Sequence, residues 1–181
     1  NNTLEREFDI VVPGNELKFN RVHPYEGVYD FTRSNTMLNF AREHNKIVRG
    51  HTLVWHSALP TWIISGGWSD TELEDILEDH IKNVVNYTKN NYSEIIIAWD
   101  VVNEALSKCQ NGTSMNIRNY SACSSDKPPY EGYPDNIWKN VPDYIAKAFN
   151  WTHEIDPNIK LFYNDYETER NTTQGEQKFN D

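Results

Sequence analysis

Residues 99–106 read Trp99-Asp100-Val101-Val102-Asn103-Glu104-Ala105-Leu106, one residue after three consecutive isoleucines at 95–97. Because β-branched residues favour extended structure, this stretch predicts a buried strand over Ile95–Val102, with Glu104 just past its carboxyl end. A carboxyl group beside an amide is poor core material, and burial of a carboxyl group raises its pKa, which suits a general acid. The alternative is a Glu that caps or salt-bridges the next loop. Its place at a strand end favours the catalytic interpretation.

The rest of the chain alternates short apolar runs with helical patterns. The apolar runs predict further strands at Phe8–Val12, Lys46–Val54 and Ile159–Tyr163. Helical spacing predicts helices over Asn35–His44, from a Ser69-Asp70 cap to about Asn90, and from Pro142, where a proline suits the first turn. Their inward faces are Met37, Leu38 and Ala41; Leu73, Ile76, Leu77, Ile81, Val84, Val85 and Thr88; and Tyr144, Ile145, Ala148, Phe149 and Thr152. The stretch of more than 30 residues before Pro142 is predicted to be one long polar loop.

Strand–helix units in series predict a parallel sheet, in which the carboxyl ends of the strands meet at one edge. Each predicted strand is followed by polar or aromatic side chains: Asn15 and Lys18, His51 and Trp55, Asn103 and Glu104, and Asn164 and Tyr166. Polar groups from successive strands at one edge are typical of an α/β fold of the (β/α)8 barrel type. The competing doubly wound sheet usually carries a glycine-rich turn for phosphate, which this chain lacks.

Composition excludes several classes of partner. The chain has 17 Lys and Arg against 27 Asp and Glu, a net charge of -10, whereas nucleic acids and anionic membranes require clustered positive charge. Its longest apolar stretches are five or six residues, too short to span a membrane. No cysteine or histidine spacing predicts a metal site. The six Trp, ten Tyr and seven Phe leave a neutral sugar as a possible ligand, although most aromatic rings in proteins only pack.

Seven Asn-x-Ser/Thr sequons point to a secreted, extracellular glycoprotein, because chance would supply about three. They begin at Asn1, Asn86, Asn91, Asn111, Asn119, Asn150 and Asn171. Cys109 and Cys123 lie 14 positions apart in the predicted loop. A disulfide is favoured over a pair of free thiols, and closing a loop of about 15 residues contributes roughly 3 kcal/mol in the chain-entropy model.

Four segments are recognisable in order along the chain. They are Pro13-Gly14-Asn15-Glu16-Leu17-Lys18, Gly50-His51-Thr52-Leu53-Val54-Trp55-His56-Ser57 with Leu59-Pro60-Thr61-Trp62, Trp99 to Ala105, and Leu161-Phe162-Tyr163-Asn164-Asp165-Tyr166. Together they resemble glycoside hydrolase family 10, the endo-β-1,4-xylanases, over essentially the whole chain. The resemblance implies a (β/α)8 barrel that cleaves xylan with retention of configuration. It also implies a monomeric full-length protein without a cofactor, because two carboxylates and water suffice for the chemistry.

The same resemblance implies roles for individual residues. Glu104 would protonate the leaving oxygen and then deprotonate the incoming water, while Asn103 would hold the 2-hydroxyl of the reacting sugar. The other implied substrate-binding residues are His51 and Trp55 around that sugar, Asn15 and Lys18 at the next sugar outward, Tyr166 on the leaving-group side, and Asn164 near the catalytic pair. Another retaining glycosidase with Asn-Glu at its fourth strand would share the mechanism, but not the His51–His56 segment.

By the family's register, residues 1–181 form a single partial catalytic domain with about strands two to five of eight. We expect both ends to be cut, because the chain starts without an initiator Met or signal peptide and stops where 179–181 begin a helical pattern. An isolated arc of four strands leaves two unpaired edges, so we expect the isolated chain to fold poorly or to associate.

The family's nucleophile, a Glu in a Thr-Glu-Leu-Asp segment after the seventh strand, is absent. The similar Thr71-Glu72-Leu73-Glu74 lies upstream of Glu104 and follows Ser69-Asp70, so it is interpreted as the start of a helix. Since retention requires two carboxyl groups about 5–5.5 Å apart, the isolated fragment is expected to be inactive. If the natural protein lacks that Glu, the alternative is a non-catalytic xylan- or oligosaccharide-binding protein.

Two positions depart from the family's pattern and predict weak binding of the outer sugars on the non-reducing side. Gly14 stands where the family commonly has Glu, and Ala58 where it has Gln. One sugar hydrogen bond is worth about 0.5–1.5 kcal/mol. Introducing Gly14→Glu and Ala58→Gln together into the full-length protein should therefore tighten xylobiose binding there, measured by titration calorimetry. Equal affinity in parent and variant would contradict the prediction.

Overall fold

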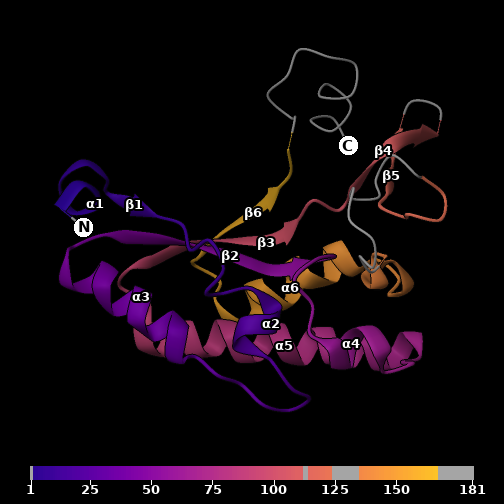
Figure 1. Ribbon diagram of the computed structural model, residues 1–181, viewed down its shortest axis with the longest axis horizontal. Helices are drawn as coiled ribbons and strands as arrows, with labels where there is room; N and C mark the ends of the chain where they lie inside the picture. Colours follow the sequence, from indigo (N-terminus) through magenta and orange to yellow (C-terminus); the bar gives the residue numbers. More distant parts are fainter. Residues whose placement is uncertain (1, 112–113, 124–134, 167–181) are drawn as a thin grey trace.

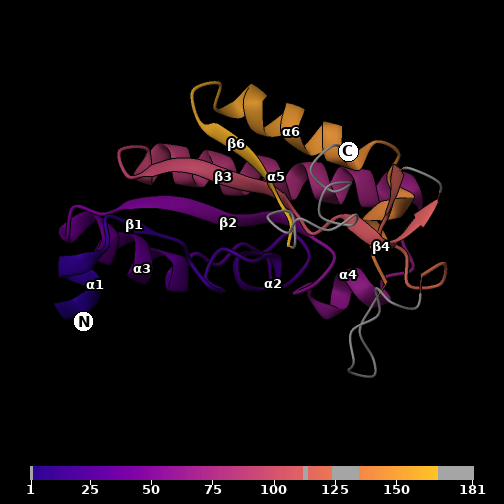
Figure 2. The same ribbon diagram turned by 90° about the horizontal axis from the view of Figure 1, so that it is seen from above.

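The structure is a computed structural model that describes residues 2–111, 114–123 and 135–166. Four parallel strands form one sheet in the order β1 (Ile10–Val11), β2 (Ile47–Trp55), β3 (Ile96–Asn103) and β6 (Lys160–Asn164). The helices α3 (Thr32–Glu43), α5 (Asp70–Tyr92) and α6 (Tyr144–Ile155) cover one face of it (Figures 1 and 2). The described strands and helices thus form an open arc of a (β/α)8 barrel, which confirms the predicted fold class.

The observed elements differ modestly from the predicted ones. Strands β2, β3 and β6 each begin and end one residue later than predicted, and α5 ends at Tyr92 instead of about Asn90. β1 is shorter than Phe8–Val12 because only Ile10 and Val11 pair with β2. Helix α3 begins at Thr32 instead of Asn35, where the Thr32 backbone N–H donates to Asp30 Oδ1 at 2.9 Å. The short helices α1 (Asn2–Glu7), α2 (Phe19–Val22) and α4 (Thr61–Ser65) were not predicted.

The prediction of one long polar loop after β3 was wrong. Strands β4 (Leu106–Asn111) and β5 (Ser114–Ile117) form an antiparallel hairpin there, followed by a 3-10 helix at Ile137–Asn140. Helix α6 begins at Tyr144, after Asp143 in a left-handed conformation, rather than at Pro142. On α6, Tyr144, Ala148 and Thr152 are buried, while Ile145 and Phe149 are only half-buried; Trp151, which was not predicted, is also buried. The predicted helical pattern at 179–181 lies outside the described residues.

The segment Thr71–Glu74 starts a helix, as the sequence indicates. Ser69 Oγ accepts from the Glu72 backbone N–H at 3.3 Å, and Glu72 Oε2 accepts from the Ser69 backbone N–H at 2.8 Å. These reciprocal bonds form a capping box at the first turn of α5. Hydrogen bonds from Ser69 lower the pKa of the Glu72 carboxyl group. Glu72 therefore serves the helix terminus and lies on the helix layer, away from the strand ends.

A close contact between two strands lies in the middle of the sheet. Gly50 on β2 and Trp99 on β3 are register partners, and the Trp99 side chain is fully buried. A Cβ atom placed on Gly50 would lie only 2.4 Å from the Trp99 ring. Position 50 must therefore be a glycine, because the Trp99 indole occupies the space that a Cβ atom would need.

Replacing Gly50 with alanine should destabilise the full-length protein by about 1–3 kcal/mol, because the new methyl group overpacks the core. A loss of stability would be informative, because Gly→Ala at an unstrained position usually stabilises a protein by lowering the conformational entropy of its unfolded chain. Urea denaturation measures the change. Gly14→Ala is the matched control, because no heavy atom lies within 4 Å of its added Cβ. Equal stability of the Gly50→Ala variant and the parent would refute this account of the contact.

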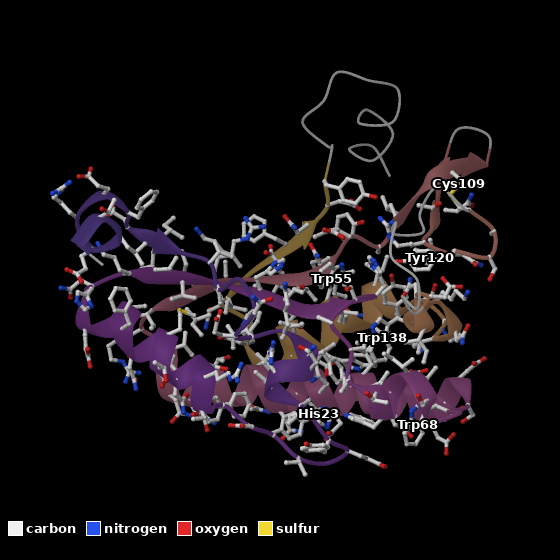
Figure 3. The ribbon with its side chains drawn as sticks, in the orientation of Figure 1. His23, Trp55, Trp68, Cys109, Tyr120 and Trp138 are labelled. Carbon is white, nitrogen blue, oxygen red and sulfur yellow. A yellow bond between two sulfur atoms is a disulfide. The ribbon has the colours of Figure 1, made fainter. Side chains whose placement is uncertain are left out.

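Two buried imidazoles, His23 and His80, stack with aromatic rings. Figure 3 shows His23 beneath the sheet. His80 stacks on Phe19 at 3.6 Å between ring centroids, and His23 stacks on Tyr29 at 4.1 Å. Burial lowers the pKa of His23 to about 4, although Asp79 opposes the shift. Burial, followed by the neighbouring His23, also lowers the pKa of His80 well below its ordinary value. Both imidazoles are therefore neutral in the folded protein at neutral pH.

The free energy of unfolding should fall as the pH drops from about 6.5 toward 4. In this window the unfolded chain binds protons on His23 and His80 that the folded protein excludes. His23 alone accounts for about 3 kcal/mol, at about 1.4 kcal/mol per pKa unit. In urea titrations of the full-length protein, His23→Phe should flatten the pH dependence, whereas a substitution of the exposed His153 should not. A slope that His23→Phe leaves unchanged would contradict this origin.

Candidate active site

Three strands end at the same level on one edge of the sheet. Trp55 of β2 is the register partner of Asn103 of β3, and Asn103 is the register partner of Asn164 of β6. Glu104 follows Asn103 directly, as predicted. Figure 3 shows Trp55 at the end of the sheet that faces the β4–β5 hairpin. Parallel pairing therefore brings together side chains from three strands that are far apart in the sequence.

The carboxylate of Glu104 contacts the aromatic lining of this edge. Glu104 is half-buried, and its Oε2 atom accepts a hydrogen bond from Trp55 Nε1 at 3.1 Å. Its backbone N–H donates to the Asn164 carbonyl at 2.8 Å. The residue adopts a left-handed backbone conformation, with φ at 52°. Because Oε2 is occupied by the indole, Oε1 is the oxygen better placed to exchange a proton with a ligand.

The amide of Asn103 is oriented by a neighbour. Asn103 is buried, and its Oδ1 atom accepts from Asn164 Nδ2 at 2.7 Å. An amide whose oxygen is occupied in this way presents its Nδ2 group as a donor. Such a donor is suited to a hydroxyl oxygen on a ligand beside Glu104. Asn164 thus lies next to both Asn103 and Glu104.

A buried carboxylate lies below the predicted His51. Asp100 is 3% exposed; its Oδ2 atom lies 2.9 Å from His51 Nδ1, and its Oδ1 atom accepts from Arg49 Nε at 2.7 Å. Asp100 was not predicted as a site residue, although a charged residue inside an apolar strand is a signal that could have identified it. It orients the imidazole and cannot serve as a free nucleophile while these cations and donors engage it.

His51, Asp100 and Asn164 line a cavity of about 420 Å³ together with Arg49 and the segment Val12–Gly14. A larger cavity of about 700 Å³ lies at the opposite end of β3 and β6, around Ile96 and Lys160. It contains none of the predicted site residues. The smaller cavity contains His51 and Asn164 of the predicted site, whereas Glu104, Asn103 and Trp55 are not among its lining residues.

The predicted outer residues join the same edge. Lys18 Nζ donates to Asn15 Oδ1 at 3.1 Å and lies 4.9 Å from the centroid of the Trp55 ring. Tyr166 is linked to the Glu104 turn through Arg118, because its hydroxyl accepts from a guanidinium N–H of Arg118 at 2.9 Å. The structure therefore brings all eight predicted site residues into one connected group around Glu104.

Several residues around Glu104 were missed in the sequence. Tyr163 accepts from the backbone N–H groups of Ala105 and Leu106 at 3.1 and 3.2 Å. Arg118 donates to the Glu104 carbonyl at 2.9 Å. Burial, followed by the charge of Arg118, lowers the pKa of His56 to about 3, although a hydrogen bond to the Glu104 backbone opposes the shift. No spacing in the sequence connects these side chains to Glu104.

The two cysteines form a disulfide beside this edge. Cys109 on β4 is bonded to Cys123, with a Cα–Cα distance of 5.6 Å. Figure 3 places Cys109 and Tyr120 on the side of the hairpin. The Tyr120 ring lies 6.0 Å from the His56 ring, centroid to centroid. The disulfide therefore closes the segment that follows the candidate acid.

The candidate glycosylation sites fall into three groups. Asn86, Asn91 and Asn150 are exposed on α5 and α6, and Asn119 is half-buried. The hydroxyl-bearing residues of the sequons at Asn86 and Asn150, Thr88 and Thr152, are buried. The side chains of Asn1, Asn111 and Asn171 lie outside the described part of the structure.

Two further searches cover the described residues only. No group of three or more His, Cys, Asp or Glu side chains within them could hold a metal ion. None of the described helices is long and apolar enough to cross a membrane.

Comparison with known proteins gives consistent similarities. The model of glycosyl hydrolase family 10 matches residues 1–180. Endo-1,4-β-xylanase B of Thermotoga neapolitana is 40% identical over 167 residues, which cover 91% of this chain and 41% of that protein. The β-1,4-xylanase of Dictyoglomus thermophilum is 38% identical over 168 residues, which cover 93% of this chain and 41% of that protein.

A solved structure agrees with the sequence relatives. Xylanase 10B from Thermotoga petrophila, solved in complex with xylobiose, is similar with a TM-score of 0.79 at 38% identity. The alignment covers 99% of this chain and 48% of that one. The chain thus spans between 41% and 48% of the length of these relatives. With the family model matched over nearly every residue, the chain belongs to glycosyl hydrolase family 10.

Proposed function

We propose that this chain is part of a secreted endo-β-1,4-xylanase that acts by a retaining double displacement, with Glu104 as the acid/base. The observation that carries the proposal is the position of Glu104, which follows a buried strand beside Asn103 and is hydrogen-bonded to Trp55. The relatives named above are xylanases, and one of them binds xylobiose. Because the chain spans less than half of each, the activity is proposed for the full-length protein.

In the first step, a nucleophilic carboxylate attacks the anomeric carbon while Glu104 transfers its proton to the leaving oxygen. In the second step, Glu104 takes a proton from water, which attacks the same carbon and releases the nucleophile. The Glu104 Oε1 atom is proposed to carry this proton, because Oε2 is bonded to Trp55 Nε1. The nucleophile is proposed to be a Glu of a Thr-Glu-Leu-Asp segment outside residues 1–181.

The contacts of the neighbouring residues support the proposed sugar positions. Asn103 Nδ2 would donate to the 2-hydroxyl of the reacting sugar, since its Oδ1 is bonded to Asn164. His51 and Trp55 would line that sugar. The next sugar outward would meet the paired Asn15 and Lys18. Tyr166 would face the sugar that leaves, because Arg118 joins its hydroxyl to the Glu104 backbone.

Two features support the proposal of an extracellular location. Three sequon asparagines are exposed on helices, and the Cys109–Cys123 disulfide is typical of an oxidising compartment. We therefore propose that the protein is secreted and that glycan attachment occurs at exposed sequons such as Asn86 and Asn150. No cofactor is required, since two carboxylates and water complete the reaction.

Replacing Glu104 with glutamine in the full-length protein should lower kcat for xylan hydrolysis by about 10²–10⁴-fold, because general acid/base catalysis typically contributes this much. Binding of xylopentaose, measured by titration calorimetry, should change little. The matched control is Glu72→Gln, which removes a carboxylate that caps α5 and should leave kcat unchanged.

Two outcomes would count against the proposal in different ways. Undiminished hydrolysis by Glu104→Gln would remove Glu104 from the acid/base role. A full-length parent protein that binds xylopentaose without hydrolysing it would favour a carbohydrate-binding function instead.

A further inference from the structure

The backbone of Glu104 adopts a conformation that its side chain does not favour. Its φ of 52° lies in the left-handed region, which a residue with a Cβ rarely occupies unless its surroundings impose it. The amide groups of this turn are all engaged. The Glu104 N–H donates to Asn164, and the Ala105 and Leu106 N–H groups donate to the Tyr163 hydroxyl. The direction of the Glu104 carboxylate therefore depends on a turn that other residues maintain.

One residue engages the three carbonyl groups of the same turn. Arg118 Nε donates to the Glu104 carbonyl at 2.9 Å, and an Nη group donates to the Leu106 carbonyl at 2.9 Å. The Arg118 backbone N–H donates to the Ala105 carbonyl at 2.7 Å. The same Nη group also reaches the Tyr166 hydroxyl, and Arg118 is only 3% exposed.

We propose that Arg118 is a positioning residue for the acid/base, which holds Glu104 in its left-handed turn and aligns Tyr166 on the leaving-group side. This inference rests on the proposed function. It concerns proton transfer to the leaving oxygen, because the turn determines where the Glu104 carboxylate points. Arg118 acts through Glu104 and Tyr166 and does not itself take part in the chemistry.

The contacts require an arginine in particular. A guanidinium presents several N–H donors in a rigid plane and can therefore reach the carbonyls of Glu104 and Leu106 together with Tyr166. A lysine has the same charge, but its single nitrogen cannot keep this arrangement. His56 approaches the same turn as a neutral group, because burial and the nearby guanidinium lower its pKa to about 3. The Glu104 carbonyl therefore receives one charged and one neutral donor.

The β4–β5 hairpin delivers Arg118 to this position. Arg118 follows β5 directly, and Leu106 and Ile117 are register partners at the base of the hairpin. The Cys109–Cys123 disulfide closes the same segment on the far side of Arg118. The hairpin therefore has a function at Glu104 beyond connecting β3 to α6.

The test compares two substrates in the full-length protein with the substitution Arg118→Lys. Xylopentaose needs a proton on its leaving oxygen, whereas 2,4-dinitrophenyl β-xylobioside has a leaving group that departs without one. For xylopentaose, kcat/KM should fall at least tenfold, with most of the loss in kcat. For the dinitrophenyl substrate, kcat/KM should fall threefold or less, because this constant reports only the first step.

Arg42→Lys is the matched control. Arg42 also donates to a backbone carbonyl, that of Asn91, and lies over a tyrosine ring at 4.4 Å, but it is on the helix layer. This variant should change neither constant.

The outcomes separate the two proposals. An equal loss on both substrates, or no loss on either, would overturn the positioning role of Arg118. If neither Arg118→Lys nor Arg118→Gln folds, as judged by thermal melting, the residue belongs to the fold and the inference is also overturned. A parent protein that cleaves neither substrate would instead contradict the proposed function.

Discussion

The site depends on the parallel register of three strands. Trp55, Asn103 and Asn164 are partners at the ends of β2, β3 and β6, so hydrogen bonds of the backbone determine which side chains meet. A shift of one residue would turn each of these side chains to the opposite face of the sheet. In the same register, Gly50 and Trp99 face each other deeper in the sheet, where only a glycine leaves room for the indole. The positions of the site side chains at the strand ends and the packing of Trp99 in the core therefore both depend on the register of β2 and β3.

Charged groups are buried at this edge only where several partners surround them. Asp100 is bonded to Arg49 and lies against His51, and Arg118 donates to carbonyls on Glu104 and Leu106. A buried charge without such partners would cost several kcal/mol. Because each partner is also part of the site, the charges orient the functional side chains while their own burial is compensated. A substitution of Asp100 or Arg118 should therefore change both the orientation of the site residues and the stability of the fold.

Periodic patterns in the sequence predicted most of the fold. Apolar runs and helical stripes located β2, β3, β6 and α5 to within one or two residues. The β4–β5 hairpin was missed because polar residues such as Asn111 and Ser114 give it no alternating apolar pattern. The Cys109–Cys123 disulfide and the hydrogen bonds of Arg118 join the hairpin to its surroundings, and no local pattern in the sequence connects these positions.

The same distinction applies to the site. Residues at or directly after the end of a strand, such as Asn164 and Glu104, could be predicted because the strand itself positions them. Arg118, Tyr163 and His56 could not, since each reaches the Glu104 turn from another element through a hydrogen bond that has no local signal. Asp100 is intermediate, because a charge in an apolar strand is visible even though its partners are not.

The buried hydroxyls of Thr88 and Thr152 would restrict any glycosylation at Asn86 and Asn150 to an early stage of synthesis. Both pack inside helices and bond to carbonyls four residues earlier, at Val84 and Ala148. A glycosyltransferase that must contact the sequon hydroxyl could modify Asn86 or Asn150 only before α5 and α6 have folded. In a cell that glycosylates these sequons, attachment of a sugar chain would therefore compete with formation of the helices. The fraction of molecules carrying a glycan at Asn86 would then record how fast that helix forms in the cell.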